Sequence, residues 1–153
     1  MQHRSSVFEL TCAPISTVRI GLVGAGQRGR VTLSRYAYVE GAEFRAVVDP
    51  DPTAVASALE LLREQRRPLP ETSTNVEAWR ELCRREDIDL IYICTDWNNH
   101  AAMAVEAMRC GKHVAVEVPA ATTVADCWEL VRTAEATQRH CFMTENCCYD
   151  WFA

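Results

Sequence analysis

The sequence of 153 residues has a single lysine, Lys112, and carries a net charge of −5 at neutral pH. Proteins that bind nucleic acid usually gather an excess of basic residues on one face, and this composition does not supply such an excess. We therefore expect no nucleic-acid partner. The sequence also lacks an apolar run long enough to cross a bilayer, so we expect no membrane partner.

Targeting signals and repeats are also missing. Residues 1–17 lack the apolar core of a secretory signal peptide, and we interpret them as a flexible leader before the first strand. No internal repeat or low-complexity tract follows. With 48% hydrophobic residues, the composition is ordinary for a globular protein. We expect one domain over residues 18–153.

Eight cysteines are present, yet none form a Cys-x-x-Cys pair and no Cys/His cluster has the spacing of zinc ligands. We therefore expect no metal site and interpret the thiols as reduced, small apolar residues. Reduced thiols are typical of the cytoplasm, where we expect the protein. The adjacent pair Cys147 and Cys148 is either a special site or a tightly packed strand end.

A glycine-rich turn is the most informative motif. Gly24, Gly26 and Gly29 follow the apolar run 18–23 with the spacing Gly-x-Gly-x-x-Gly. Such a turn, followed by a helix, presents backbone N–H groups and a positive dipole end to a pyrophosphate. Asp49 ends the next apolar run, where its carboxylate would accept hydrogen bonds from ribose hydroxyls and repel a 2′-phosphate. The pattern predicts NAD rather than NADP; the alternative is a glycine turn without a ligand.

Apolar runs alternate with helical patterns along the rest of the chain. The runs predict strands at 18–23, 43–48, 90–94, 113–116 and 141–144. Helices are predicted from about Gln27 to Val39, from Asp51, from Asn75, from Ala101 to Gly111, and from Thr123. This order predicts an α/β fold with a Rossmann-type doubly wound parallel sheet. We expect inward-facing side chains at Val76, Trp79, Val124, Cys127 and Trp128.

Ligands of doubly wound sheets lie beyond the carboxyl ends of the strands. Besides the glycine turn and Asp49, this rule selects the turns at 95–100 and 117–119. If the last strand is correct, it also selects Glu145 and Asn146. The candidate site is therefore spread over five turns.

The chain resembles the N-terminal domain of the Gfo/Idh/MocA oxidoreductases. The resemblance depends on the glycine turn, on the helix-opening turn that ends in His100, and on Gly-Lys-His-Val before an acid-x-proline turn at Glu117. In the typical oxidoreductases that turn is Glu-Lys-Pro, and its lysine assists proton transfer. Here Val118 occupies the middle position, and Lys112 is too far along the strand to replace the lysine. The departure argues against an ordinary dehydrogenase.

A narrower resemblance is to the NAD-dependent alpha-N-acetylgalactosaminidases, which share this fold. It depends on Thr-Asp-Trp at 95–97, Glu-Val-Pro-Ala-Ala at 117–121, Cys-Trp at 127–128 and Glu-Asn-Cys-Cys-Tyr at 145–149. The resemblance implies cofactor contacts at Gln27, Arg28, Asp49, Trp97, Asn98, Asn99, His100, Glu117, Val118 and Asn146.

The resemblance also implies a hydrolysis without net redox change. NAD would oxidise the sugar C3 hydroxyl, a base would remove the C2 proton, the C1 group would leave, water would add, and C3 would be reduced again. It implies a second, substrate domain, absent from this chain, that holds the sugar and the base. We therefore expect the catalytic residues beyond Ala153 and negligible turnover by this chain alone. A sugar or cyclitol dehydrogenase domain and a non-catalytic NAD-binding module stay as alternatives, and a homo-oligomer is compatible with the sequence.

Several candidate residues have a second interpretation. Arg28 either pairs with the pyrophosphate or stays solvated, and Glu117 either binds ribose or sugar or forms a salt bridge with an arginine. Trp97 either packs on the cofactor or covers local core, and His100 either orients nicotinamide or substrate or caps a helix. Asn146 either contacts the carboxamide or ribose or serves as a turn residue.

Overall fold

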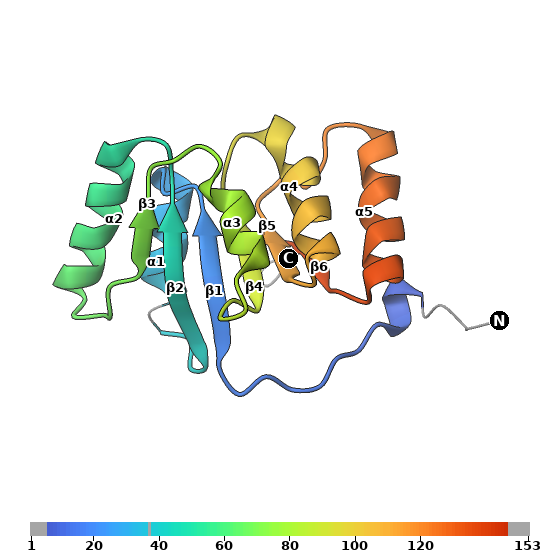
Figure 1. Cartoon of the computed structure of the whole chain (residues 1–153), viewed down its shortest axis with the longest axis horizontal. Helices are drawn as coiled ribbons and strands as arrows, with labels where there is room; N and C mark the ends of the chain where they lie inside the picture. Colours follow the sequence, from blue (N-terminus) through green and yellow to red (C-terminus); the bar gives the residue numbers. More distant parts are fainter. Residues whose placement is uncertain (1–5, 37, 147–153) are drawn as a thin grey trace.

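The computed structural model describes residues 6–36 and 38–146. Its centre is a six-stranded sheet in the order β3-β2-β1-β4-β5-β6 (Figure 1), and every neighbouring pair is parallel. The strands are β1 (Val18–Val23), β2 (Ala42–Val48), β3 (Glu71–Ser73), β4 (Leu90–Ile93), β5 (His113–Val116) and β6 (Cys141–Met143). The order confirms the predicted doubly wound sheet.

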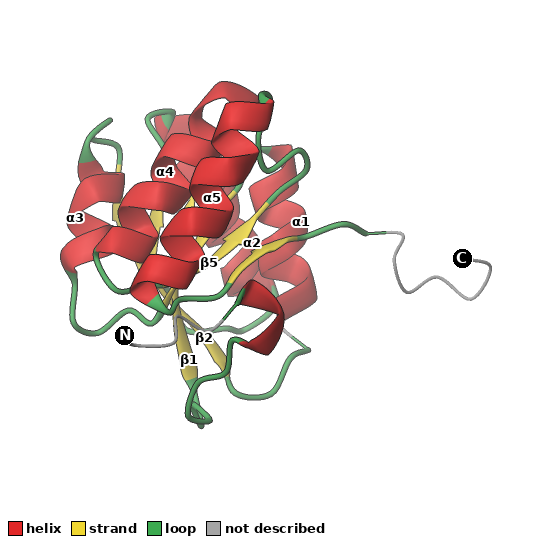
Figure 2. Ribbon diagram, turned by 90° about the vertical axis from the view of Figure 1, so that its right-hand side faces the viewer, coloured by secondary structure: helices red, strands yellow, loops and turns green. Residues whose placement is uncertain are grey.

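Five α-helices connect the strands, and a short 3-10 helix, η1 (Val7–Glu9), precedes β1. They are α1 (Gln27–Tyr36), α2 (Pro52–Glu64), α3 (Ala78–Arg84), α4 (Trp97–Arg109) and α5 (Val124–Thr137). Figure 2 shows the sheet between a layer of α3, α4 and α5 and a layer of α1 and α2. Val7 of η1 packs against the core on the α3–α5 side.

Two apolar clusters fill the two interfaces between sheet and helices. Ile91, Ile93 and Val114 belong to the cluster beneath α3, α4 and α5. Tyr92 and Ala115, which alternate with them along β4 and β5, belong to the cluster beneath α1 and α2. Successive side chains of a strand point to opposite faces, so a strand covered on both faces needs a continuous apolar run. This is why β4 and β5 were predictable from the sequence.

Strand β3 was not predicted from the sequence, and the helix that follows it begins later than predicted. The three residues of β3 are polar and largely exposed, so no apolar run marks this edge strand. It forms because its backbone pairs with Ala46, Val47 and Val48 of β2. The third helix begins at Ala78 rather than Asn75. Val76 is 64% exposed instead of buried, whereas Trp79 packs partly buried against the core.

The inward face of α5 and the end of α1 also differ from the prediction. Val124, Cys127 and Trp128 are exposed, and Trp128 retains 56% of its surface. Leu130, Thr133 and Ala134 are buried instead, because only the later turns of α5 pack against the core. The first helix ends at Tyr36 rather than Val39.

The tail of the predicted family motif, at Cys147, Cys148 and Tyr149, lies outside the described residues. In the part of the chain that is described, no helix is both long and apolar enough to cross a membrane.

Candidate dinucleotide-binding site

The carboxyl ends of the strands lie along one edge of the sheet, where the arrowheads of Figure 1 point. The turns after β1, β2, β4, β5 and β6 all reach this edge. The structure therefore brings the five predicted turns onto one rim.

The three glycines of the first turn perform three different tasks. Gly24 has a φ of +96°, and a Cβ there would lie 2.5 Å from the carbonyl oxygen of Cys94. At Gly29 a Cβ would collide with the carbonyl oxygen of Gly24, so α1 can pack on β1 only without a side chain. At Gly26 nothing lies within 4 Å of a Cβ. The middle glycine thus borders open space at the start of α1, which fits a turn that lets a pyrophosphate approach its backbone.

Asp49 lies at the end of β2 beside the glycine turn. Its Oδ2 accepts a hydrogen bond from the backbone N–H of Ala25 at 2.7 Å, and its Oδ1 accepts one from Asp51 at 2.8 Å. These bonds fix the carboxylate, and each oxygen retains a lone pair for a further donor. The placement suits an acceptor of ribose hydroxyls.

Asp49 lines a cavity of about 570 Å³ that we call the adenosine-side cavity. Gly24 and Gly26 of the glycine turn also line it. Its other lining residues include Pro50, Asn75, Val76, Glu77, Trp79, Arg80, Cys94, Thr95, Asp96, Asn99 and Met103. The lining residues from Asn75 to Arg80 were not predicted as part of the site, because a helix was predicted over the turn that follows β3.

On the other side of the glycine turn, Arg28 and Glu117 pair with each other. Arg28 Nε donates to Glu117 Oε2 at 2.9 Å, and a second guanidinium nitrogen donates to Asn146 Oδ1 at 3.2 Å. The Glu117 hydrogen bond raises the pKa of Arg28 above its usual value. The salt bridge considered for Glu117 is therefore present, and its partner is the arginine that was a candidate for the pyrophosphate.

Glu117 is buried, and a second donor reaches it from β4. The hydroxyl of Tyr92 donates to Glu117 Oε1 at 3.3 Å, and burial raises the pKa of Tyr92 to about 12, so it remains a donor at neutral pH. Arg28, Tyr92, Glu117 and Asn146 line a second cavity, of about 480 Å³, which we call the nicotinamide-side cavity. Tyr92 was not predicted as a site residue, because it lies within an apolar run that indicates only a buried strand.

His100 faces the protein interior and not the rim. The side chain is 1% exposed; its Nδ1 lies 2.8 Å from the carbonyl oxygen of Pro119, and its Nε2 lies 3.1 Å from that of Thr95. The ring therefore joins the turn after β4 to the turn after β5. Capping of α4 is performed by Asp96, whose side chain accepts from the N–H of Asn98 at 3.1 Å.

The other candidates differ in where they lie. Asn99 lines the adenosine-side cavity and donates to Asp96. Trp97 and Asn98 are exposed at the start of α4, and Val118 is half-buried in the turn after β5; none of the three lines either cavity. Lys112 is buried at the opposite end of β5, where its Nζ donates to the carbonyl oxygens of Arg85 and Ile88. Lys112 therefore does not stand in for the lysine that typical oxidoreductases have at the position of Val118.

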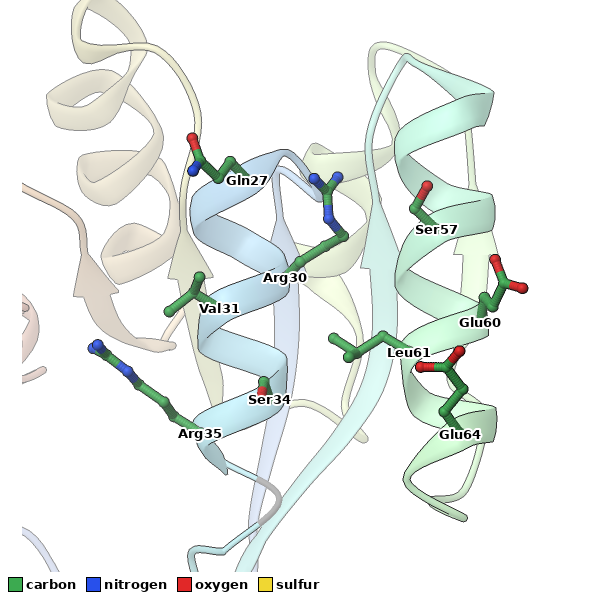
Figure 3. A pocket seen from close by; sticks show the side chains of 9 residues that line it. All are labelled: Gln27, Arg30, Val31, Ser34, Arg35, Ser57, Glu60, Leu61 and Glu64. Carbon is green, nitrogen blue, oxygen red and sulfur yellow. The ribbon is translucent and has the colours of Figure 1, made fainter.

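Gln27 lines a third hollow, of about 540 Å³, between α1 and α2. Figure 3 shows Gln27 at the first turn of α1, above Arg30 and Val31, with Glu60 and Glu64 across the hollow on α2. Because most of this hollow runs along the helices and away from the strand ends, we do not assign the dinucleotide to it.

The six described cysteines are free thiols. Iodoacetamide at neutral pH should modify Cys12 and Cys127 first, because both are exposed. Burial raises the pKa of Cys83 and Cys94 to about 12. The reactive thiolate is then scarce, and each should react at least about 100-fold more slowly.

Peptide mapping by mass spectrometry after timed quenching measures the four rates. All four thiols should react alike in strong denaturant, which serves as the control. Equal labelling of Cys94 and Cys12 in the folded protein would contradict the partly buried position of Cys94.

A glycine turn at the start of a helix, with an acid at the end of the second strand of a doubly wound sheet, defines a dinucleotide-binding Rossmann domain. Residues 18–145 match the family model described as oxidoreductase family, NAD-binding Rossmann fold. The chain belongs to this Gfo/Idh/MocA family.

Curated relatives are similar over nearly the whole chain. It is 53% identical over 150 residues to glycosyl hydrolase family 109 protein 2 of Phocaeicola vulgatus, covering 98% of this chain and 36% of the relative. It is 48% identical over 150 residues to an alpha-N-acetylgalactosaminidase of Bacteroides fragilis, covering 98% of this chain and 35% of that enzyme. The chain thus spans about a third of the length of these relatives.

Solved structures show the same fold. The WlbA dehydrogenase of Chromobacterium violaceum, in complex with NADH and UDP-GlcNAcA, superposes with a TM-score of 0.77 at 23% identity, covering 92% of this chain and 39% of that one. The myo-inositol dehydrogenase of Lactobacillus casei, in complex with NAD(H) and myo-inositol, has a TM-score of 0.71 at 25% identity, covering 84% of this chain and 36% of that one.

Proposed function

We propose that this chain binds NAD along the rim, with the adenosine half in the adenosine-side cavity and the nicotinamide half towards the Arg28–Glu117 pair. The open space at Gly26, beside the fixed carboxylate of Asp49, is the observation that carries the proposal. The free N–H groups at the start of α1 would hold the pyrophosphate. Asp49 would accept from the ribose hydroxyls of the adenosine half.

The other candidate residues divide between contact and positioning. Asn99 would contact the cofactor from the adenosine-side cavity, while Trp97 and Asn98 would contact it from the exposed start of α4. On the nicotinamide side, Arg28, Glu117 and Asn146 present one charge-paired surface, with Val118 in the adjoining turn. His100 would hold the turns in place without touching the ligand. Gln27 would reach the pyrophosphate from the first turn of α1.

We infer further that the chain is the coenzyme-binding part of an NAD-dependent glycosidase acting on alpha-N-acetylgalactosaminides. The inference is supported by the 48% identity to a protein of that name and by Val118 in place of the lysine typical of the oxidoreductases. NAD would supply a transient oxidation of the sugar at C3. The residues of this chain would hold the coenzyme, while the sugar and the base that acts on it would belong to a second domain.

The alternative function, a sugar or cyclitol dehydrogenase, is supported by the likeness to the myo-inositol dehydrogenase. The two functions differ in the fate of the coenzyme, so the test follows absorbance at 340 nm during turnover of a chromogenic alpha-N-acetylgalactosaminide. The longest protein that contains this chain is the enzyme to use. Release of the chromophore without accumulation of NADH supports the glycosidase. Accumulation of NADH with a free sugar or cyclitol supports the dehydrogenase. The absence of both reactions supports a non-catalytic NAD-binding module.

Location, assembly and domain limits are also proposals. The free thiols support a cytoplasmic location. We propose residues 18–153 as the coenzyme domain, with 1–17 as its leader, and the family match over residues 18–145 supports the first limit. A homo-oligomer would be tested by light scattering.

Asp49→Ala should weaken NAD binding by the value of a hydrogen bond to a charged group, ~1.5–3 kcal/mol. It should also narrow the preference for NAD over NADP, because the charge that opposes a 2′-phosphate is gone. Isothermal calorimetry with both coenzymes measures the two effects.

Asp51→Ala is the matched control, since it removes the same charge two residues away. Asp51 caps α2, where its side chain accepts from the N–H of Thr53 at 2.8 Å. Its loss should cost about 1 kcal/mol of stability and leave the Kd for NAD nearly unchanged. Equal affinities of the wild type and Asp49→Ala for NAD would contradict the assignment of Asp49 to the ribose. If the wild type gives no binding heat with NAD or NADH, the proposal that this chain binds NAD is wrong.

A further inference from the structure

One wall of the adenosine-side cavity is built from a segment whose conformation was not predicted from the sequence. It consists of Val76 and Glu77 in the turn after β3 and of Trp79 and Arg80 in the first turn of α3. Val76 is an exposed apolar side chain on this wall. The wall therefore offers an apolar and planar surface to a ligand that occupies this cavity.

Arg80 makes two side-chain contacts on this wall. Its guanidinium carbon lies 4.1 Å from the centroid of the Trp79 ring, and its Nε donates to Glu77 Oε2 at 2.6 Å. Trp79 packs in turn against the core. One face of the guanidinium is thus covered by indole and one edge is paired, so little side-chain freedom is left to lose when a ligand stacks on the group.

We propose that Arg80, supported by Trp79, is the platform on which the adenine ring stacks. The inference rests on the proposed function, because it needs the ribose at Asp49 and the pyrophosphate at Gly26. Both residues line the same cavity as Arg80. Because Arg80 lines the cavity that holds this ribose, we expect the attached base to reach this wall. Guanidinium planes stack on nucleobases as they do on aromatic rings, and Val76 adds apolar contact beside them.

Arg80→Ala should raise the Kd about tenfold for both NAD and ADP-ribose, since the loss of a base-stacking partner weakens binding by about this factor. The equal loss is expected because the two ligands share the adenosine half. Arg80→Lys should show most of the same loss, because lysine keeps the charge but has no planar face. Calorimetry on the 153-residue chain, with thermal unfolding to verify the fold, measures these changes.

Two further variants serve as controls. Arg84→Ala removes the same charge from the same helix, but Arg84 pairs with Glu106 at 3.6 Å and lies outside the cavity. It should leave both Kd values within about twofold, as expected for a surface substitution. The double variant Glu77→Gln/Arg80→Ala removes the carboxylate that Arg80→Ala leaves unpaired. The loss of affinity should persist in it.

The possible results separate the platform from the proposed function. Wild-type affinity in Arg80→Lys would show that charge alone acts, and it would overturn the platform. An effect of Arg80→Ala no larger than that of Arg84→Ala, or one confined to NAD, would overturn it as well. In each of these cases the wild type still binds, so the proposed function stands. Failure of the wild type to bind both NAD and ADP-ribose would overturn the platform and the proposed function together, whereas binding of NAD without ADP-ribose would overturn the platform alone.

Discussion

Replacing Gly26 with alanine should weaken NAD binding about 100-fold, the value of one or two backbone hydrogen bonds to a charged group. The free energy of unfolding should stay within about 0.5 kcal/mol of the wild type. A methyl group at this position meets nothing within 4 Å in the protein. It would instead occupy the space through which the pyrophosphate reaches the backbone at the start of α1. Calorimetry and urea unfolding measure the two quantities.

Gly29→Ala is the matched comparison, since it adds the same methyl group three residues later. Here the new Cβ would collide with the carbonyl oxygen of Gly24. Helix α1 would have to move away from β1, at a cost of at least about 2 kcal/mol, as for other overpacked positions. We therefore expect Gly26→Ala to lose binding alone and Gly29→Ala to lose both binding and stability. A Gly26→Ala protein that binds NAD as tightly as the wild type would contradict the placement of the pyrophosphate.

His100→Ala should lower the free energy of unfolding by about 2–4 kcal/mol, because it leaves a cavity and removes the ring whose N–H bonds one of two neighbouring carbonyl oxygens. These oxygens, of Thr95 and Pro119, belong to the turns after β4 and β5. Releasing both turns should also raise the Kd for NAD, since Asn99 and Glu117 would lose their fixed positions. Urea unfolding followed by circular dichroism, together with calorimetry, measures both effects.

Asn98→Ala is the control for His100. Asn98 lies in the same turn of α4 but is exposed, so Asn98→Ala should change the free energy of unfolding by less than about 0.5 kcal/mol. If His100→Ala unfolds at the same urea concentration as Asn98→Ala, the ring does not hold the turns together.

Much of the rim was predictable because its parts are local. Gly24, Gly26, Gly29 and Asp49 lie within one strand–helix–strand unit, and each owes its role to backbone conformation or to its position at a strand end. The buried strands β4 and β5 were predictable for a similar reason, since a strand covered on both faces reads as a continuous apolar run.

The pairing of Arg28 with Glu117 was not predictable in the same way. These residues are 89 positions apart, and Arg28 and Asn146 are 118 apart. The sequence indicated that each lies at the rim, but it left open whether each would face a ligand, solvent or another side chain. The sheet order decided this, because it brings the ends of β1, β5 and β6 to the same edge.

By itself, the sequence determined the class of fold, the type of coenzyme and the turns that lie at the carboxyl ends of the strands. Hydrophobic periodicity and the freedom of glycine are properties of neighbouring residues, so they can be read along the chain. Only the tertiary structure decided that His100 points inward, that Arg28 and Glu117 neutralise each other, and that Trp79 and Arg80 wall the adenosine-side cavity. Each of these contacts joins elements distant in sequence or depends on a strand that forms only by pairing with its neighbour, and no local pattern encodes such an arrangement.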